Sequence, residues 1–119
     1  MTLRRVILEM GAGNDLHGGD YTKAAVRAVE DALHHSSLSF MRSLGVDREA
    51  LRVDVTIGVQ RPDAVDTEKV KAMLPVGQVS VKAVKGGLDI ADEAFDDMAV
   101  IASAAVEVRL EVGQSRRRV

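Results

Sequence analysis

The strongest constraint on the fold is the alternation within residues 51–61, LRVDVTIGVQR, where apolar side chains occupy every second position. A period of two indicates a β-strand with one face on a core and the other on water or a partner. Residues 3–10 and 78–85 share this period, and so do residues 99–112, where the alternation is strict from Ala104 onwards. We therefore expect four strands, each buried on one side.

Between these strands the period changes to that of helices. Residues 22–37 carry an alanine-rich apolar face at helical spacing, which lets a helix lie close to a sheet. Asp20 or Thr22 can cap its start. A shorter helix is expected in residues 66–74, and Gly45 is a plausible stop signal in the segment between the first helix and the second strand.

The resulting order, β-α-β-α-β-β, predicts an α+β protein. We expect a two-layer α/β sandwich, with a four-stranded mixed sheet and helices on one face. Residues 1–112 would form a single domain, and residues 113–119, GQSRRRV, a flexible basic tail. Residues 88–99 contain five acidic side chains and are expected to hold at most a helical turn.

Composition excludes several classes of function. The 119 residues have a net charge of −2 and only three aromatic side chains, which argues against nucleic acid as a partner. The chain has no cysteine, so disulfides and thiolate chemistry are excluded. No apolar run approaches the roughly 20 residues that cross a membrane. We expect a cytoplasmic protein that binds neither nucleic acid nor membrane.

The run Met10–Lys23, MGAGNDLHGGDYTK, is the most distinctive segment and holds four of the chain's ten glycines. If the first strand ends near Met10, the loop has ten or eleven residues, whereas about two to six usually suffice. It would lie where a strand ends and a helix begins, the position at which free N–H groups favour anions. Alternatively, the glycines serve only a tight turn.

Asp15 and His17 are the candidate chemical groups of this loop. In an extended segment, residues two apart project to the same side, so the pair could ligate zinc or act as an acid/base pair. Lys23, on the first helical turn, could supply positive charge. The dinucleotide fingerprint fails because Leu16 stands where glycine is needed, and the Walker loop fails because Asp20 follows Gly19.

The segment resembles the signature of a family of conserved hypothetical proteins of bacteria and plants. That signature is G-x-G-x-D-x-H-G, and this chain matches it at Gly11, Gly13, Asp15, His17 and Gly18. The resemblance continues through VDVTIGV and VKGGL to AAVEV, and so covers most of the chain. It implies membership of a family whose function is unknown.

A second, local similarity concerns the zinc-dependent methylerythritol cyclodiphosphate synthases, which open with the same G-x-G-x-D-x-H spacing. By that resemblance Asp15 and His17 would be metal ligands. The chain lacks the downstream A-H-S-D-G-D segment that supplies the second histidine in those trimeric enzymes, and it is shorter.

A catalytic zinc usually has three protein ligands. His34 and His35 lie too far along the first helix to reach the loop within one subunit, although they could do so across an interface. Asp20 is a nearer candidate, and the acidic segment 89–97 could supply oxygen ligands for magnesium or manganese. Without a third ligand, Asp15 and His17 would act as an acid/base pair.

The sequence thus favours a small homo-oligomeric enzyme, of hydrolase or lyase type, acting on an anionic metabolite at residues 11–20. Asp15, His17 and Lys23 would carry the chemistry. The remaining residues of the loop would bind the substrate: Gly11, Gly13, Asn14, Gly18, Gly19 and Asp20. The alternatives are a non-catalytic anion- or nucleotide-binding module and a purely structural oligomerisation domain.

Overall fold

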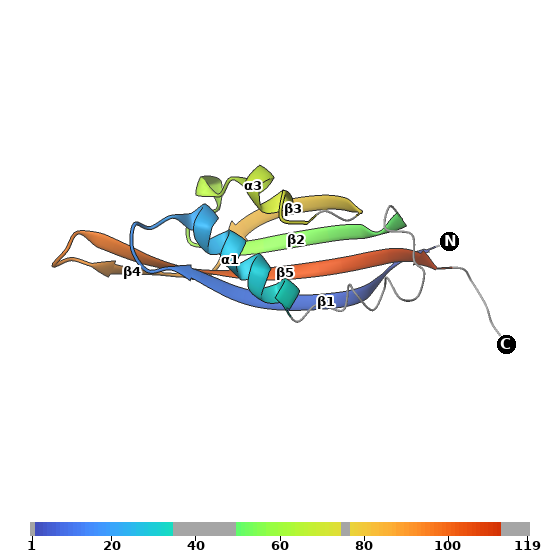
Figure 1. Ribbon diagram of the computed structural model, residues 1–119, viewed down its shortest axis with the longest axis horizontal. Coiled ribbons are helices and arrows are strands. Elements are labelled where there is room, and N and C mark those ends of the chain that lie inside the picture. The colour runs from blue at the N-terminus through green and yellow to red at the C-terminus, as the bar shows by residue number, and fades with distance from the viewer. Residues whose placement is uncertain (1, 35–49, 75–76, 113–119) are drawn as a thin grey trace.

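The computed structural model describes residues 2–34, 50–74 and 77–112 (Figure 1). Over these ranges the chain alternates between a mixed sheet and short helical segments. The elements in chain order are β1 (Thr2–Asp15), α1 (Tyr21–His34), β2 (Arg52–Val59), the 3-10 turn η2 (Pro62–Ala64), α3 (Thr67–Lys71), β3 (Gln78–Lys85), β4 (Leu88–Asp92) and β5 (Asp97–Val112).

β5 is the central strand of the sheet. It pairs antiparallel with β1 along one edge, and with β2 and then β4 along the other. β3 pairs parallel to β2 at the outside, which gives the order β1-β5-β2-β3. The register places β4 in line with β2, because Gly58 pairs with Ser103 and Leu88 with Ile101. The β4–β5 hairpin therefore extends the sheet beyond the helices (Figure 1).

The expectation of a four-stranded α/β sandwich with helices on one face is wrong. Among the described residues the sheet has five strands, which account for 54% of those residues, and the helices are short. The error lies in residues 88–99, where the acidic side chains suggested a helical turn. Leu88–Asp92 instead forms β4, and β5 begins at Asp97, two residues before the predicted strand 99–112.

Two glycines of β1 determine how closely α1 packs on the sheet. A Cβ built on Gly11 would lie 2.4 Å from the backbone nitrogen of Ala32, and one on Gly13 would lie 2.2 Å from that of Ala28. Any side chain at either position would collide with the helix backbone. The alanine-rich face of α1 completes the contact, since Ala24, Ala28 and Ala32 are fully buried.

The apolar core lies between this face of the sheet and the helices. Small and β-branched side chains dominate it, in keeping with the scarcity of aromatic residues. Its fully buried members include Val29 of α1, Val53, Val55, Ile57 and Val59 of β2, Val70 of α3, and Val100, Ala102 and Val108 of β5.

Side chains of α1 also occupy the free edge of β1. The Asp31 carboxylate accepts a hydrogen bond from the Ala12 amide at 2.9 Å, and the Arg27 guanidinium donates to the Asn14 carbonyl at 2.8 Å. These groups would otherwise be open to pairing with another strand. The helix thus protects the edge of the strand on which it packs.

Other elements expected from the sequence are present in the described residues. The strand predicted at 78–85 is confirmed, and Asp66 caps α3 by accepting from the amides of Glu68 and Lys69. The first helix is found at Tyr21–His34. Its predicted last turn, together with His35, Gly45 and the tail 113–119, lies outside the described residues.

Substituting Gly13→Ala tests the packing of α1 on β1. The added Cβ must push the helix off the strand, so we expect the free energy of unfolding to fall by about 2–3 kcal/mol. Denaturant unfolding measures the change. Asn14→Ala, at the exposed neighbouring position, is the control. A loss for Gly13→Ala of less than about 0.5 kcal/mol, the scale of ordinary surface substitutions, would contradict this account.

Candidate functional site

The loop between β1 and α1 is shorter than the sequence suggested. β1 continues to Asp15, so Gly11, Gly13 and Asn14 belong to the strand and only residues 16–20 form the connection. Gly18 and Gly19 have φ angles of +98° and +62°, which glycine adopts without strain. The Gly19 amide donates to the Met98 carbonyl at 3.1 Å, so the loop runs alongside the first residues of β5.

Asp15 is buried beneath the start of α1. Its side chain is only 6% exposed, and its Oδ2 accepts a hydrogen bond from the Asp20 amide at 2.9 Å. The Lys23 Nζ and an Arg27 nitrogen each lie 3.8 Å from Oδ1. A buried carboxylate is costly unless it is paired, and here two cations and one amide offset that cost. Asp15 therefore holds the loop, α1 and β1 together.

His17 has a different partner. Its Nδ1 lies 2.9 Å from Oδ2 of Asp97, at the start of β5, and no hydrogen bond joins it to Asp15 within the described ranges. The expected convergence of Asp15 and His17 assumed an extended chain, whereas the backbone turns after Asp15. The acidic segment 89–97, considered above as a source of metal ligands, supplies this partner instead.

Asp97 is held as a carboxylate by three hydrogen bonds. The amides of Gly18 and Met98 each donate to Oδ1 at 2.8 Å, and Nδ1 of His17 bonds to Oδ2. These contacts lower the pKa of Asp97 from 3.8 to about 2; the bond from Gly18 has the largest effect, followed by those from His17 and Met98. Because an ionised carboxylate can only accept, Nδ1 of His17 carries the hydrogen and Nε2 of the neutral ring has a free lone pair.

The imidazole of His17 is open to solvent. Its side chain is 87% exposed, although the contact with Asp97 fixes the ring at one end. Gly18 lies between this pair and Asp15. Its amide donates to Asp97, and a Cβ built on it would lie 3.7 Å from Oδ2 of Asp15. The histidine and the two cations beside Asp15 thus lie on the same short stretch of chain.

A shallow cleft of about 390 Å³ adjoins these cations on the surface of α1. Lys23 and Arg27 contribute to it from α1, and Lys69 from α3. Asp20, at its margin, caps the helix by accepting from the Lys23 amide at 3.0 Å. The carboxylate of Glu30 lines the cleft as well, so three cations and two carboxylates border this open hollow.

The structure also reveals a pair that the sequence analysis missed. The hydroxyl of Tyr21, the first residue of α1, donates to Oδ2 of Asp89 on β4. This bond, burial and the charge of Asp89 raise the pKa of Tyr21, while Arg61 opposes the rise. The other oxygen, Oδ1, is buried without a hydrogen-bond partner among the described residues. The one signal in the sequence for the strand that positions Asp89 is the short alternation of apolar Leu88 and Ile90 around it.

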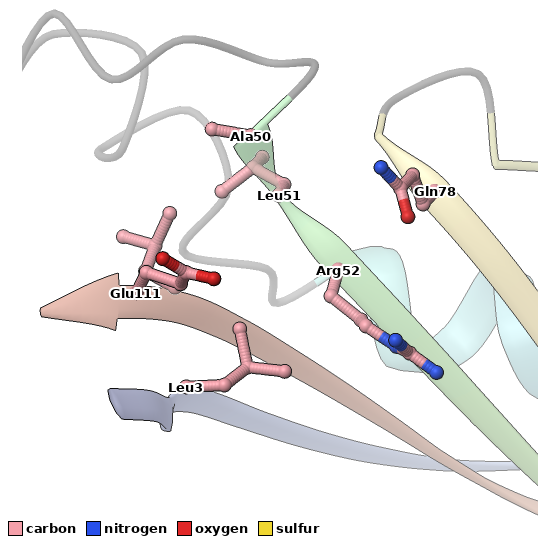
Figure 2. Close-up of a pocket in the computed structure, with 7 residues that line it drawn as sticks. Leu3, Ala50, Leu51, Arg52, Gln78 and Glu111 are labelled. Carbon is pink, nitrogen blue, oxygen red and sulfur yellow. The ribbon is translucent and has the colours of Figure 1, made fainter. Parts of the chain in front are cut away.

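Other candidates lie apart from this cluster. His34 is at the far end of α1, as the sequence analysis anticipated. A hollow of about 420 Å³ lies at the opposite end of the sheet, near the start of β1, and is lined by Leu3, Arg52, Gln78 and Glu111 among others (Figure 2). This hollow is larger than the cleft beside Lys23, but it contains none of the residues singled out from the sequence.

The described part of the chain holds neither a cluster of metal ligands nor a membrane-spanning helix. No group of three or more histidine, aspartate or glutamate side chains there is arranged to hold a metal ion. No helix in those ranges is long and apolar enough to cross a membrane.

Together, fold and site define a small protein built on a mixed sheet, with a histidine–carboxylate pair where the first helix meets the central strand. The chain belongs to the Lin0512 family of conserved hypothetical proteins, whose model matches residues 5–108. The family resemblance seen in the sequence is thereby confirmed. No curated protein sequence matches the chain significantly.

A solved structure is also similar to this protein. It is the crystal structure, at 1.22 Å resolution, of an FtsZ-like protein of unknown function from Nostoc punctiforme PCC 73102. The two chains share 33% identity and superpose with a TM-score of 0.78, over 94% of this chain and 99% of the other. This match supports the fold but assigns no activity.

Asp97→Asn tests the histidine–carboxylate contact through its pH dependence. A carboxyl group whose pKa is lowered on folding stabilises the folded state above pH 3.8, and that contribution is lost as the pH falls through about 2. We therefore expect the variant to melt below the wild type at neutral pH and the difference to vanish towards pH 2. Thermal unfolding across this range measures it, with Asp96→Asn as control. A difference that persists undiminished at pH 2 would refute this view.

The Tyr21–Asp89 contact can be tested by titrating the tyrosine hydroxyl, because Tyr21 is the chain's single tyrosine and its absorbance is not mixed with that of another. Ultraviolet absorbance should show it ionising above its ordinary pKa of 10.0. Asp89→Asn removes the charge and weakens the acceptor, so the midpoint should fall towards that value, whereas Asp92→Asn should leave it unchanged. Identical midpoints in the wild type and Asp89→Asn would show that this contact does not form.

Proposed function

We propose that this protein binds a small anionic metabolite beside the start of α1 and acts on it by acid–base catalysis, with His17 as the proton-transferring group. The observation that carries the proposal is the contact of 2.9 Å between His17 and Asp97, in a side chain that is otherwise exposed. A carboxylate at Nδ1 orients an imidazole and stabilises its protonated form. Nε2 is then free to accept a proton from a substrate and return it.

Lys23 supports the anionic character of the ligand. It lies at the third position of α1, where free amides and the helix dipole already favour negative charge. Arg27, one turn later, and Lys69 border the same cleft. A carboxylate or phosphate in this cleft would compete with Asp15 for Lys23, whose present contact of 3.8 Å is longer than a direct hydrogen bond.

The reaction that suits these groups is a hydrolysis or a lyase reaction. In a lyase reaction, His17 would remove a proton from a carbon or oxygen of the substrate, and the cations would hold the resulting charge. In a hydrolysis, His17 would activate water. We also propose a cytoplasmic location, where small phosphorylated and carboxylate metabolites are plentiful.

A metal-dependent form of the same site is the second candidate. A metal-bound histidine commonly donates its other ring nitrogen to a carboxylate, and His17 makes that contact with Asp97. Nε2 could then ligate zinc, magnesium or manganese. Asp15 is a weaker partner for such an ion, since its Oδ2 already accepts from Asp20. The acid–base form is therefore the one we favour.

A metabolite screen with matched variants tests the proposal. Phosphorylated and carboxylate compounds are first tested for a thermal shift, with and without added divalent metal, and those that bind are assayed for product by mass spectrometry. Lys23→Gln should abolish or strongly weaken the shift. His17→Gln should keep the shift and lose turnover by about 100-fold or more. Lys71→Gln, an exposed cation on α3, is the control.

The outcomes separate the candidates. A ligand that binds wild type without turnover supports a binding module instead of an enzyme. Turnover that depends on added metal supports the metal-dependent form. Undiminished turnover in His17→Gln contradicts the proposed role of that residue.

A further inference from the structure

The face of the sheet turned away from α1, here called the open face, carries most of the exposed large apolar side chains. They alternate along the strands with the buried core residues. Met10 of β1 is 66% exposed, Ile90 of β4 is 54% exposed and Leu88 of β4 is 51% exposed. Three others on this face, each between 40% and 43% exposed, are Leu8, Val84 and Ile101; Leu3, at 40%, lies farther along it opposite Glu111. Contiguous apolar surface of this kind marks an interaction site.

The strand register brings these side chains together. Ile101 on β5 lies directly between Asn14 on β1 and Leu88 on β4, and Ala99 pairs with Ile90. Met10 pairs with Ala105 two rows further along. Met10, Ile101, Leu88 and Ile90 therefore form a patch across β1, β5 and β4 with no charged side chain between them. Leu8 and Val84 lie at its margin, since Leu8 pairs with Glu107 and Val84 with Gly58.

Charge is distributed unequally on either side of this patch. Towards the start of β1 and β2, the open face carries three arginines and three carboxylates: Arg5, Arg52, Arg109, Asp54, Glu107 and Glu111. Lys82 adds a fourth cation at the boundary with the patch, level with Met10, because Lys82 pairs with Thr56, Thr56 with Ala105, and Ala105 with Met10. Most of these are paired with one another, but Lys82 makes no ion pair within the described ranges. We call this region the basic end.

The opposite region, at the tip of the β4–β5 hairpin, is acidic. Asp92 and Asp97 are cross-strand partners there, and Glu93 and Asp96 lie in the turn between them. No lysine or arginine occurs between Lys85 and Arg109. We call this region the acidic end.

We propose that two copies of this chain dimerise by packing their open faces together, antiparallel, about a two-fold axis. A two-fold interface must be self-complementary, because each patch meets its own copy. In this arrangement the apolar patch meets the apolar patch. Each acidic end lies over the basic end of the other copy, where Lys82 gains the opposite charge that it lacks within its own chain.

A second copy fits this face better than other partners do. The acidic end would be repelled by an anionic lipid surface or by nucleic acid. An unrelated protein would need its own acidic and basic regions at the same spacing on either side of an apolar patch, whereas a second copy has them by identity. Opposite charges at the two ends also favour the antiparallel orientation over the parallel one.

The dimer goes beyond the proposed function and does not depend on it. It does affect the same region, however, because Asp97 belongs to the acidic end and contacts His17. Each histidine–carboxylate pair would then lie near the basic end of the other copy. The assembly would add positive charge beside a site for an anionic ligand.

Analytical ultracentrifugation tests the dimer through apolar substitutions. The wild type should sediment at micromolar concentration with twice the chain mass of 12.8 kDa. Ile90→Lys and Met10→Lys should each raise the dimer dissociation constant by about 30-fold or more, as expected for central residues of an interface. Ala72→Lys, at an exposed position at the end of α3 on the helix side of the sheet, is the control. Circular dichroism checks that each variant is folded.

Charge reversal tests the orientation. Lys82→Glu and Asp92→Lys should each weaken the dimer, while the two together in one chain restore opposite charges at both contacts and recover affinity. Lys71→Glu, the same change on α3, should have no effect. A wild type that remains monomeric at 100 micromolar, the concentration limit chosen for this experiment, would overturn the proposal. So would a dimer that Ala72→Lys disrupts and Ile90→Lys does not, or a double variant weaker than both single ones.

Discussion

The close approach of α1 to β1 is the contact on which the rest of the structure depends. Because Gly11 and Gly13 have no side chains, the backbone of the helix rests almost directly on the strand. At this distance Asp31 and Arg27 can reach the free edge of β1, and the first turn of α1 covers Asp15. A helix held farther away by ordinary side chains would leave that carboxylate more exposed to water and its cations farther off. The packing of small residues thus sets the electrostatics of the candidate site.

The position of β5 links this contact to the second half of the site. β5 is the one strand of the described sheet that touches β1, β2 and β4, and its first residues extend past the end of β1. The loop after β1 fills that space, since Gly19 bonds to Met98 and Gly18 to Asp97. His17 is therefore held by the start of the last strand, and Tyr21 by β4 across from it. One end of the sheet gathers titratable side chains from four different elements.

Local patterns in the sequence predicted those parts of the fold that are determined locally. The alternation of 78–85 and 51–61 located β3 and β2, and Asp66 marked the start of α3. β4 was missed because acidic residues are poor strand formers, and its pairing with β5 is a contact that the segment alone does not reveal. In the site too, the residues of a local motif were found from the sequence, whereas a partner from a distant segment was not. The motif singled out His17, but its partner Asp97 is 80 residues away in sequence, and an extended backbone wrongly suggested Asp15.

The motif itself divides between two tasks when its residues are placed on the strand. Gly11, Gly13 and Asp15 are spaced by two, so all three face α1: the glycines admit the helix, and the carboxylate anchors its first turn. His17 continues the same spacing in sequence, but the strand has ended, and the side chain reaches Asp97 and solvent instead. Most of the motif is therefore accounted for by the docking of a helix. His17 is the member that packing does not explain, and for this reason the chemical role is best sought there.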